Sequence, residues 1–172
     1  MTEPGKHHPL VDLARKAIAS HLSHKPPPQT EASEGPDEPA GTFVSLKKAG
    51  QLRGCIGTIQ PVRSTLAQEV VDNAVSAATR DPRFPPLTLE ELDEVTISVD
   101  VLSTPEPVSG LDELDPSRYG IIVKSGWRKG VLLPDLPGIT AAEEQIRIAR
   151  QKAGIGENED VELLRFEVKR YA

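Results

Sequence analysis

The only cysteine of the chain, Cys55, stands in the stretch QLRGCIGTIQ, between two glycines and two residues after an arginine. Side chains two positions apart in a β-strand share a face. The sequence therefore predicts that Arg53 and Cys55 project together, with Leu52 and Ile56 pointing to the core on the opposite face. A guanidinium beside a thiol favours the thiolate, the reactive form of cysteine. This spacing would suit a nucleophilic or redox cysteine that Arg53 activates.

A packing role for the same stretch is the alternative, and the sequence leaves both open. A free cysteine commonly behaves as a small buried hydrophobe. Glycine inside a strand marks a bulge or a close approach, so Gly54 and Gly57 would accommodate a neighbouring helix as readily as a ligand. The stretch lacks the spacing of a dinucleotide fingerprint and the lysine–serine pair of a phosphate loop, so we predict no cofactor.

The sequence offers few residues that could act as a general acid or base near Cys55, because all four histidines lie within the first 24 residues. A Cys–His pair would need the N-terminal helix to deliver His21 or His24. Otherwise a carboxylate such as Asp81 or Asp100 would have to act as the base. His21 and His24 are three residues apart and could form a metal pair, but a third ligand is not evident, so we predict no metal site.

Two further stretches could carry a binding residue. In RDPRFPP, Arg83 lies between prolines and Phe84 follows it, which suits a rigid anchor for a ligand. The alternative is a helix stop with a contact between Asp81 and Arg83. Trp127 stands at a predicted hairpin tip beside two cations. If the tip is exposed, it would suit a binding contact. A tip that folds back over the sheet is equally consistent with the sequence.

The overall composition excludes several classes of protein. The 172 residues carry a formal net charge of −6, and no long Lys/Arg run offsets it, so we predict no nucleic-acid binding. One cysteine cannot form an internal disulfide, which suits a reducing compartment. The N-terminus has no apolar signal core, and the longest apolar runs fall far short of the ~20 residues that span a bilayer. We therefore expect a cytoplasmic protein without a membrane partner.

The first forty residues divide sharply in composition. Residues 9–22 place Leu, Ile and Ala on one helical stripe and predict a docked amphipathic helix. Residues 25–41 hold five prolines and several acids with almost nothing apolar. Such a segment cannot bury enough surface to order itself, so we expect a mobile proline-rich loop.

Residues 42–172 alternate between strand and helix patterns, which predicts one α+β domain over 1–172 with an antiparallel sheet flanked by helices. The strands expected are a hairpin turning at Ala49-Gly50, a strand over 95–102, a hairpin turning near 125–130, and a last strand through Phe166. Helices should follow capping boxes that begin at Thr65 and Thr140, the second closing at Gly154.

Together these pieces resemble the AMMECR-one domain family, known in bacteria and archaea as AmmeMemoRadiSam system protein A. The hexapeptide LRGCIG at 52–57 is similar to the family signature, and AATRDPRFPPLTLEEL, VTISVDVL and GVLLP follow in the family's order. The resemblance covers nearly the whole chain. It departs from the family in the proline-rich insert over 25–41 and in the absence of histidine after residue 24.

The resemblance implies a fold with two unequal lobes and a cleft at the signature motif. It also implies a Memo-like protein and a radical-SAM protein as partners. The site residues that it carries over come from the signature and from the second motif: Leu52, Arg53, Gly54, Cys55, Ile56, Gly57, Asp81, Pro82, Arg83 and Phe84.

Two functions follow as hypotheses. The first is a binding or accessory protein that holds a small anionic ligand or a partner segment at the LRGCIG motif, with Arg53 supplying charge-assisted hydrogen bonds. The second is an enzyme that uses Cys55 as a nucleophile or redox group, with Asp81 or Asp100 assisting. The sparse acid–base inventory favours the first.

Overall fold

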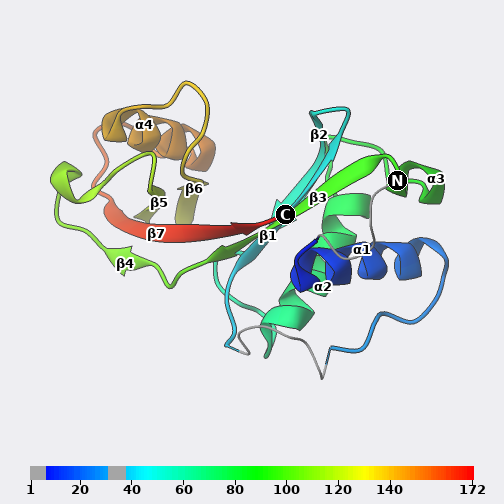
Figure 1. Ribbon diagram of the computed structural model, residues 1–172. Coiled ribbons are helices and arrows are strands. Elements are labelled where there is room, and N and C mark those ends of the chain that lie inside the picture. The colour runs from blue at the N-terminus through cyan, green and yellow to red at the C-terminus, as the bar shows by residue number, and fades with distance from the viewer. Residues whose placement is uncertain (1–6, 31–37) are drawn as a thin grey trace. The chain divides into compact units, whose positions relative to one another are not determined.

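The computed structural model describes residues 7–30 and 38–172, and the chain divides into two compact units (Figure 1). The first unit comprises Met1–Val101 with Lys169–Ala172, and the second comprises Leu102–Val168. Helices pack on antiparallel strands in both, which confirms the predicted α+β class. The predicted cleft between lobes stays a prediction. Within the described ranges, no helix has both the length and the apolar character needed to cross a membrane.

Each unit has its own set of elements. The first contains α1 (Pro9–Leu22), β1 (Thr42–Lys48), β2 (Gln51–Gly57), α2 (Leu66–Thr79), α3 (Leu89–Leu92) and β3 (Val95–Leu102). The second contains β4 (Glu106–Pro107), η1 (Leu111–Glu113), β5 (Tyr119–Ser125), β6 (Arg128–Leu132), α4 (Ala142–Ala153) and most of β7 (Glu162–Tyr171). The short elements α3, η1 and β4 were not predicted, because two to four residues are too few to show a period.

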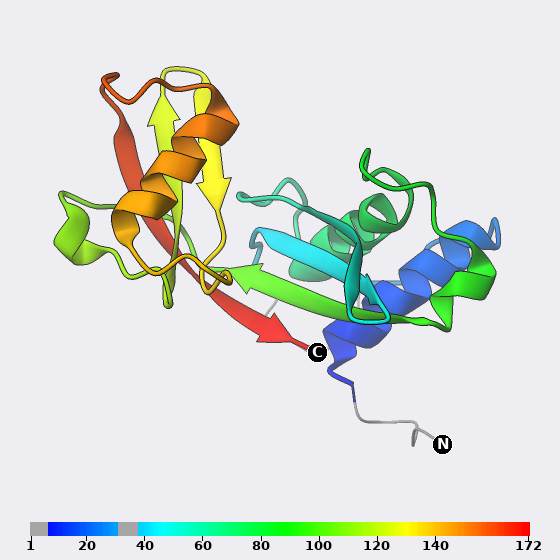
Figure 2. The same cartoon turned by 90° about the horizontal axis from the view of Figure 1, so that it is seen from above.

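In the first unit, β1 lies between β2 and β3 and is antiparallel to both. The side chains of β1 alternate, so that Val44 and Leu46 are fully buried beneath α1 and α2. Figure 2 shows the two helices on one side of these strands. The opposite side of β1–β3, which we call the outer face, carries Ser45 and Lys47.

The pairing of β2 with β1 contains a β-bulge at Arg53. The register passes from Leu46 opposite Gly54 to Lys47 opposite Leu52, so Arg53 is the extra residue. The shift places Leu52 on the outer face, where it is 40% exposed. The prediction that Leu52 points to the core is therefore wrong, since strict alternation fails across a bulge.

In the second unit, β5 lies between β6 and β7, and α4 packs across one face of them. The predicted capping box at Thr140 is wrong. The helix begins at Ala142 with Ala141 as its N-cap, which has no side-chain acceptor. The predicted end is confirmed, because Gly154 closes the helix in the left-handed conformation with φ of 69°.

The predicted helix over 9–22 and the start at Thr65 are confirmed. His8 caps α1 through Nδ1, and the Thr65 hydroxyl accepts from the amide of Gln68. Residues 25–30 and 38–41 form no helix and almost no strand. The rest of the predicted mobile loop, residues 31–37, lies outside the described residues.

We predict that Gly54→Ala strongly destabilises the protein. A Cβ at Gly54 would overlap the carbonyl oxygen of Ala77 on α2, and neither backbone can yield without moving the helix off the sheet. Overpacking of this kind costs roughly 1–3 kcal/mol or more. Urea unfolding followed by far-UV circular dichroism should show the loss. Gly50→Asn is the matched control, because the hairpin turn is open and Asn tolerates its positive φ. Equal stability of both variants would contradict this packing.

Candidate functional site

The buried carboxylate of Asp81 joins the two sequence motifs. Its Oδ2 accepts from the amide of Cys55 at 3.0 Å and from Nη2 of Arg83 at 2.7 Å. Its Oδ1 accepts from the amide and from Nε of Arg83, both at 3.0 Å. These hydrogen bonds, led by that of the Arg83 guanidinium, hold the pKa of Asp81 far below its usual range. The carboxylate is therefore charged and fully engaged.

Arg83 also contacts the backbone of the first motif. Its Nη2 donates to the carbonyl of Cys55 at 3.4 Å, and the guanidinium lies 5.5 Å from the centre of the Phe84 ring. The ion pair with Asp81 raises the pKa of Arg83. The Asp81–Arg83 contact, predicted as the structural alternative, is confirmed. The side chain of Arg83 is still 56% exposed, so part of it faces solvent.

Arg53 points to α3 and the proline loop. Its Nε and Nη2 donate to the two carboxylate oxygens of Glu91 at 3.0 and 3.1 Å, and Nη1 donates to the carbonyl of Pro85 at 2.9 Å. The pKa of Glu91 is lowered to about 2, chiefly by Arg53 and secondarily by Lys48. Arg53 thus links the bulge of β2 to α3 and the proline loop, and the activation of the Cys55 thiol by Arg53 stays a prediction.

Cys55 lies half-buried on the outer face. Its Sγ is 3.3 Å from Oγ of Ser45, which is its register partner on β1, and Ser98 is the next partner on β3. The three side chains form a row of one thiol and two hydroxyls across three strands. The thiol therefore meets a hydroxyl, which is a weak base, where the enzyme hypothesis needs a carboxylate or imidazole.

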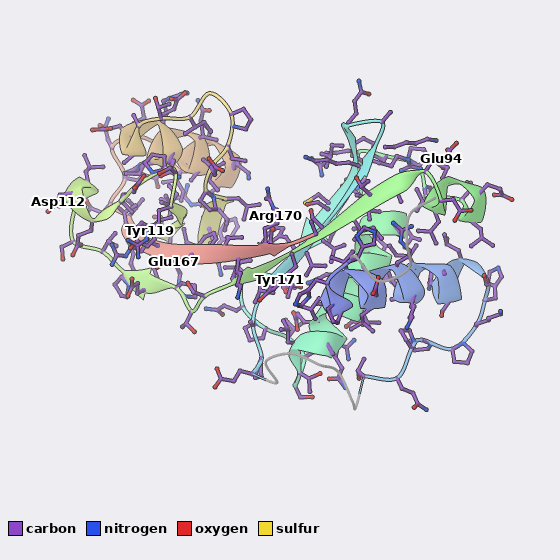
Figure 3. The ribbon with its side chains drawn as sticks, in the orientation of Figure 1. Glu94, Asp112, Tyr119, Glu167, Arg170 and Tyr171 are labelled. Carbon is purple, nitrogen blue, oxygen red and sulfur yellow. The ribbon has the colours of Figure 1, made fainter. Side chains whose placement is uncertain are left out.

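A hollow of about 210 Å³ adjoins this row. It is lined by Ser45, Lys47, Thr96, Ile97, Ser98, Arg170 and Ala172. Arg170 reaches it from the C-terminal end of β7, where Figure 3 labels it, and donates through Nε and Nη2 to the buried carboxylate of Asp100 at 2.8 and 2.9 Å. Asp100 is thus engaged by a guanidinium and does not face Cys55 as a base.

The remaining predicted site residues pack against protein atoms. Gly54 lies against the carbonyl of Ala77, and the ring of Phe43 covers Gly57, where a Cβ would overlap it. Ile56 packs on the core beneath α2. The structure therefore brings Leu52 and Cys55 to the outer face, and Asp81, Arg83 and Phe84 to the edge of β2, whereas Gly54 and Ile56 face the core and Pro82 is exposed.

The residues that sequence reasoning missed are Ser45, Lys47 and Arg170. A signal existed for two of them, because TFVSLKK alternates as a strand and its odd-numbered positions share a face. No local pattern connects Arg170 to Asp100, which lie 70 residues apart.

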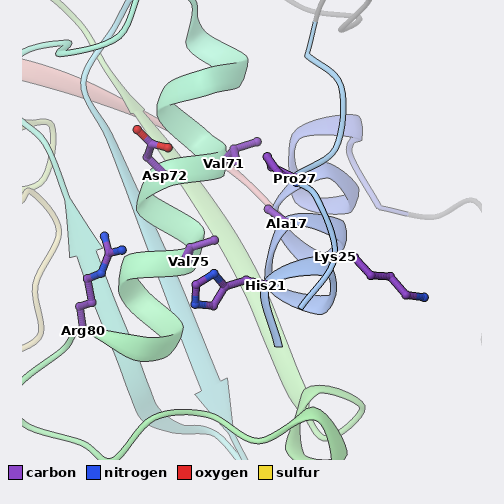
Figure 4. Close-up of a pocket in the computed structure, with 8 residues that line it drawn as sticks. All are labelled: Ala17, His21, Lys25, Pro27, Val71, Asp72, Val75 and Arg80. Carbon is purple, nitrogen blue, oxygen red and sulfur yellow. The ribbon is translucent and has the colours of Figure 1, made fainter. Parts of the chain in front are cut away.

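A second hollow, of about 200 Å³, lies between α1 and α2 (Figure 4). Val71 and Val75 of α2 face Ala17 and His21 of α1 there, whereas the side chain of Lys25 points away. Its lining residues come from α1, α2 and the segments that follow these helices. None of residues 52–57 lines it. Across residues 7–30 and 38–172, no three His, Cys, Asp or Glu side chains gather as a metal site.

A family model described as AMMECR1 matches residues 11–171. The chain belongs to the AMMECR1 family. A Thermotoga maritima protein is 50% identical over 169 residues, covering 95% of this chain and 97% of its own length. A Clostridium acetobutylicum protein is 44% identical across 95% of this chain, but the match spans only 36% of that longer protein.

A solved structure of similar shape supports the fold. The crystal structure of uncharacterized protein PH0010 from Pyrococcus horikoshii matches with a TM-score of 0.84 at 33% identity. The match covers 94% of this chain and 88% of that one. The family resemblance inferred from LRGCIG is confirmed by the family model over residues 11–171.

We predict that Arg53 and Glu91 act as one structural unit. Arg53→Met and Glu91→Gln should each lower the free energy of unfolding by about 1–3 kcal/mol, because each leaves a charged partner without its hydrogen bonds. The double variant should lose less than the sum, which a double-mutant cycle measures. The exposed pair Arg147 and Glu144, 3.8 Å apart, is the control and should couple weakly. Additive losses at Arg53 and Glu91 would refute the link.

The same pair has a pH signature. The pKa of Glu91 in the folded protein, about 2, lies below its unfolded value of about 4.3. A depressed folded pKa gives stability that is complete above the unfolded value and is lost as the pH falls towards 2. The stability difference between the parent and Glu91→Gln should therefore shrink between about pH 4 and pH 2. A constant difference across this window would show that folding does not lower the pKa of Glu91.

Proposed function

We propose that this AMMECR1-family protein is a binding or accessory protein whose recognition surface is the outer face around Cys55. The observation that carries the proposal is the row of Ser45, Cys55 and Ser98 beside the hollow of about 210 Å³. Hydroxyls, a thiol and the exposed side chain of Leu52 offer hydrogen bonds and apolar contact together. Such a mixture is typical of surfaces that bind another molecule.

The charges favour a partner segment over a small anion. Arg53 is compensated by Glu91, Arg83 by Asp81, and Arg170 has Asp100 as a bidentate partner. A guanidinium already paired with a carboxylate attracts a second anion weakly, since the pair is nearly neutral at a distance. Lys47 adds one exposed cation to the hollow. A polypeptide segment with polar groups and one apolar side chain fits this balance best.

The partners that we propose are a Memo-like protein and a radical-SAM protein, as the family resemblance implies. A cytoplasmic setting would suit both this pairing and the single free thiol. The enzyme alternative has less support. The thiol contacts a hydroxyl, and the nearest carboxylate motif, Asp81, binds the amide of Cys55 and is neutralised by Arg83.

Ser45→Tyr should abolish partner binding while the protein stays folded, because the ring would occupy the hollow. Biolayer interferometry against the purified Memo-like and radical-SAM proteins of the same organism measures the loss, which should be tenfold or more. Ser109→Tyr, at an exposed serine of the second unit, is the control and should bind as the parent does.

Two results would count against the proposal. If neither purified protein binds the parent chain, the proposed partners are wrong. If Ser45→Tyr binds as tightly as the parent, the surface lies elsewhere. The enzyme alternative would gain if native Cys55 reacted with iodoacetamide faster than free glutathione at the same pH, since only an activated thiol does so.

A further inference from the structure

Trp127 is the only tryptophan of the chain and is 91% exposed at the turn between β5 and β6. The predicted hairpin tip is confirmed, and of the two alternatives left open for it, exposed or folded back, the structure has the exposed one. Tryptophan is highly buried on average and is enriched at the centres of protein interfaces. A side chain of this size left in water at a hairpin tip is a candidate anchor for another protein surface.

Contacts of the neighbouring residue Arg128 hold the hairpin tip in place. The neighbouring Arg128 donates through Nη1 to the carbonyl of Gly154 at 2.8 Å and forms an ion pair with Glu159. Gly126 supplies the left-handed turn conformation, with φ of 61°. Because the hairpin is already ordered, docking through Trp127 would cost little conformational entropy.

The same hairpin carries a net positive charge that would attract carboxylates. Lys124 and Lys129 are register partners on β5 and β6, so two like charges stand opposite each other. Like charges directly opposite each other destabilise a strand pair. Glu162 is the partner of Lys124 on β7, and the row of three therefore keeps a net positive charge.

A matching surface exists on α3 of the first unit. Leu89 is 46% exposed, and Glu90 and Asp93 lie next to it at positions that share a helix surface. The helix is fixed by a capping box between Thr88 and Glu91. Glu94, which Figure 3 labels directly after it, is paired with Lys48 at 3.1 Å, so the acids left for a partner are Glu90 and Asp93. An exposed leucine beside two acids complements an exposed tryptophan on a hairpin with two lysines.

We propose that the chain self-associates head to tail, with Trp127 of one copy packing on Leu89 of a second copy. Lys124 and Lys129 then face Glu90 and Asp93. The two surfaces differ, so the contact is heterologous and leaves one tip and one α3 unused at the ends of each assembly. The contact is small, which gives a dissociation constant of about 0.1–1 mM.

Sedimentation velocity at increasing protein concentration and low salt tests this proposal. The parent chain should show a rising weight-average mass that falls again at high salt. Trp127→Ala should stay monomeric, and so should the double variant Glu90→Lys, Asp93→Lys. Both sites are exposed, so folding should be unaffected, which circular dichroism checks.

Mixing the two variants gives the decisive measurement. Each keeps the surface that the other lacks, so an equimolar mixture should form dimers and stop there. A parent chain that stays monomeric at about 1 mM overturns the proposal. So does a mixture that stays monomeric although the parent associates, because a symmetric contact between like surfaces would behave that way.

Discussion

The carboxylate of Asp81 is the interaction on which the region around LRGCIG depends. It satisfies the amide of Cys55 at the free edge of β2, while Arg83 satisfies the carbonyl of the same residue. An open strand edge would offer both groups to any passing chain. The DPRF turn therefore closes the edge with side chains, much as Lys152 covers the carbonyl of Val131 on β6. The two motifs that suggest a reactive site in the sequence therefore serve first to satisfy the backbone groups of this strand edge.

Both units seat a helix on a strand through a glycine. The carbonyl of Ala77 on α2 lies against Gly54, and the carbonyl of Ala149 on α4 lies against Gly130. A larger residue at either glycine would hold the helix away from the sheet and open the core beneath it. In the signature hexapeptide, the glycine beside Cys55 therefore serves close packing between α2 and β2. The outer face is the side of β1–β3 that α1 and α2 leave uncovered.

The elements were predictable from the sequence where a period was long enough to show. The helical stripe over the fourteen residues of α1 and the alternation of VTISVDVL in β3 were each long enough to predict the element and its bounds. The candidate site was less predictable, because Glu91, the carboxylate that pairs with Arg53, lies 38 residues further along. Strict alternation placed Arg53 beside the thiol, whereas a distant carboxylate drew it to α3. Sequence reasoning paired Arg53 with a neighbour other than Glu91, its ion-pair partner.

The exposure of Trp127 has a practical consequence for experiments on this chain. Its indole is surrounded by water in the folded state and stays so after unfolding, so its emission should change little when either core melts. A flat fluorescence trace in denaturant would therefore say nothing about stability. The cores built around Val44 and Ile121 hold no indole to report on them and need a backbone signal instead.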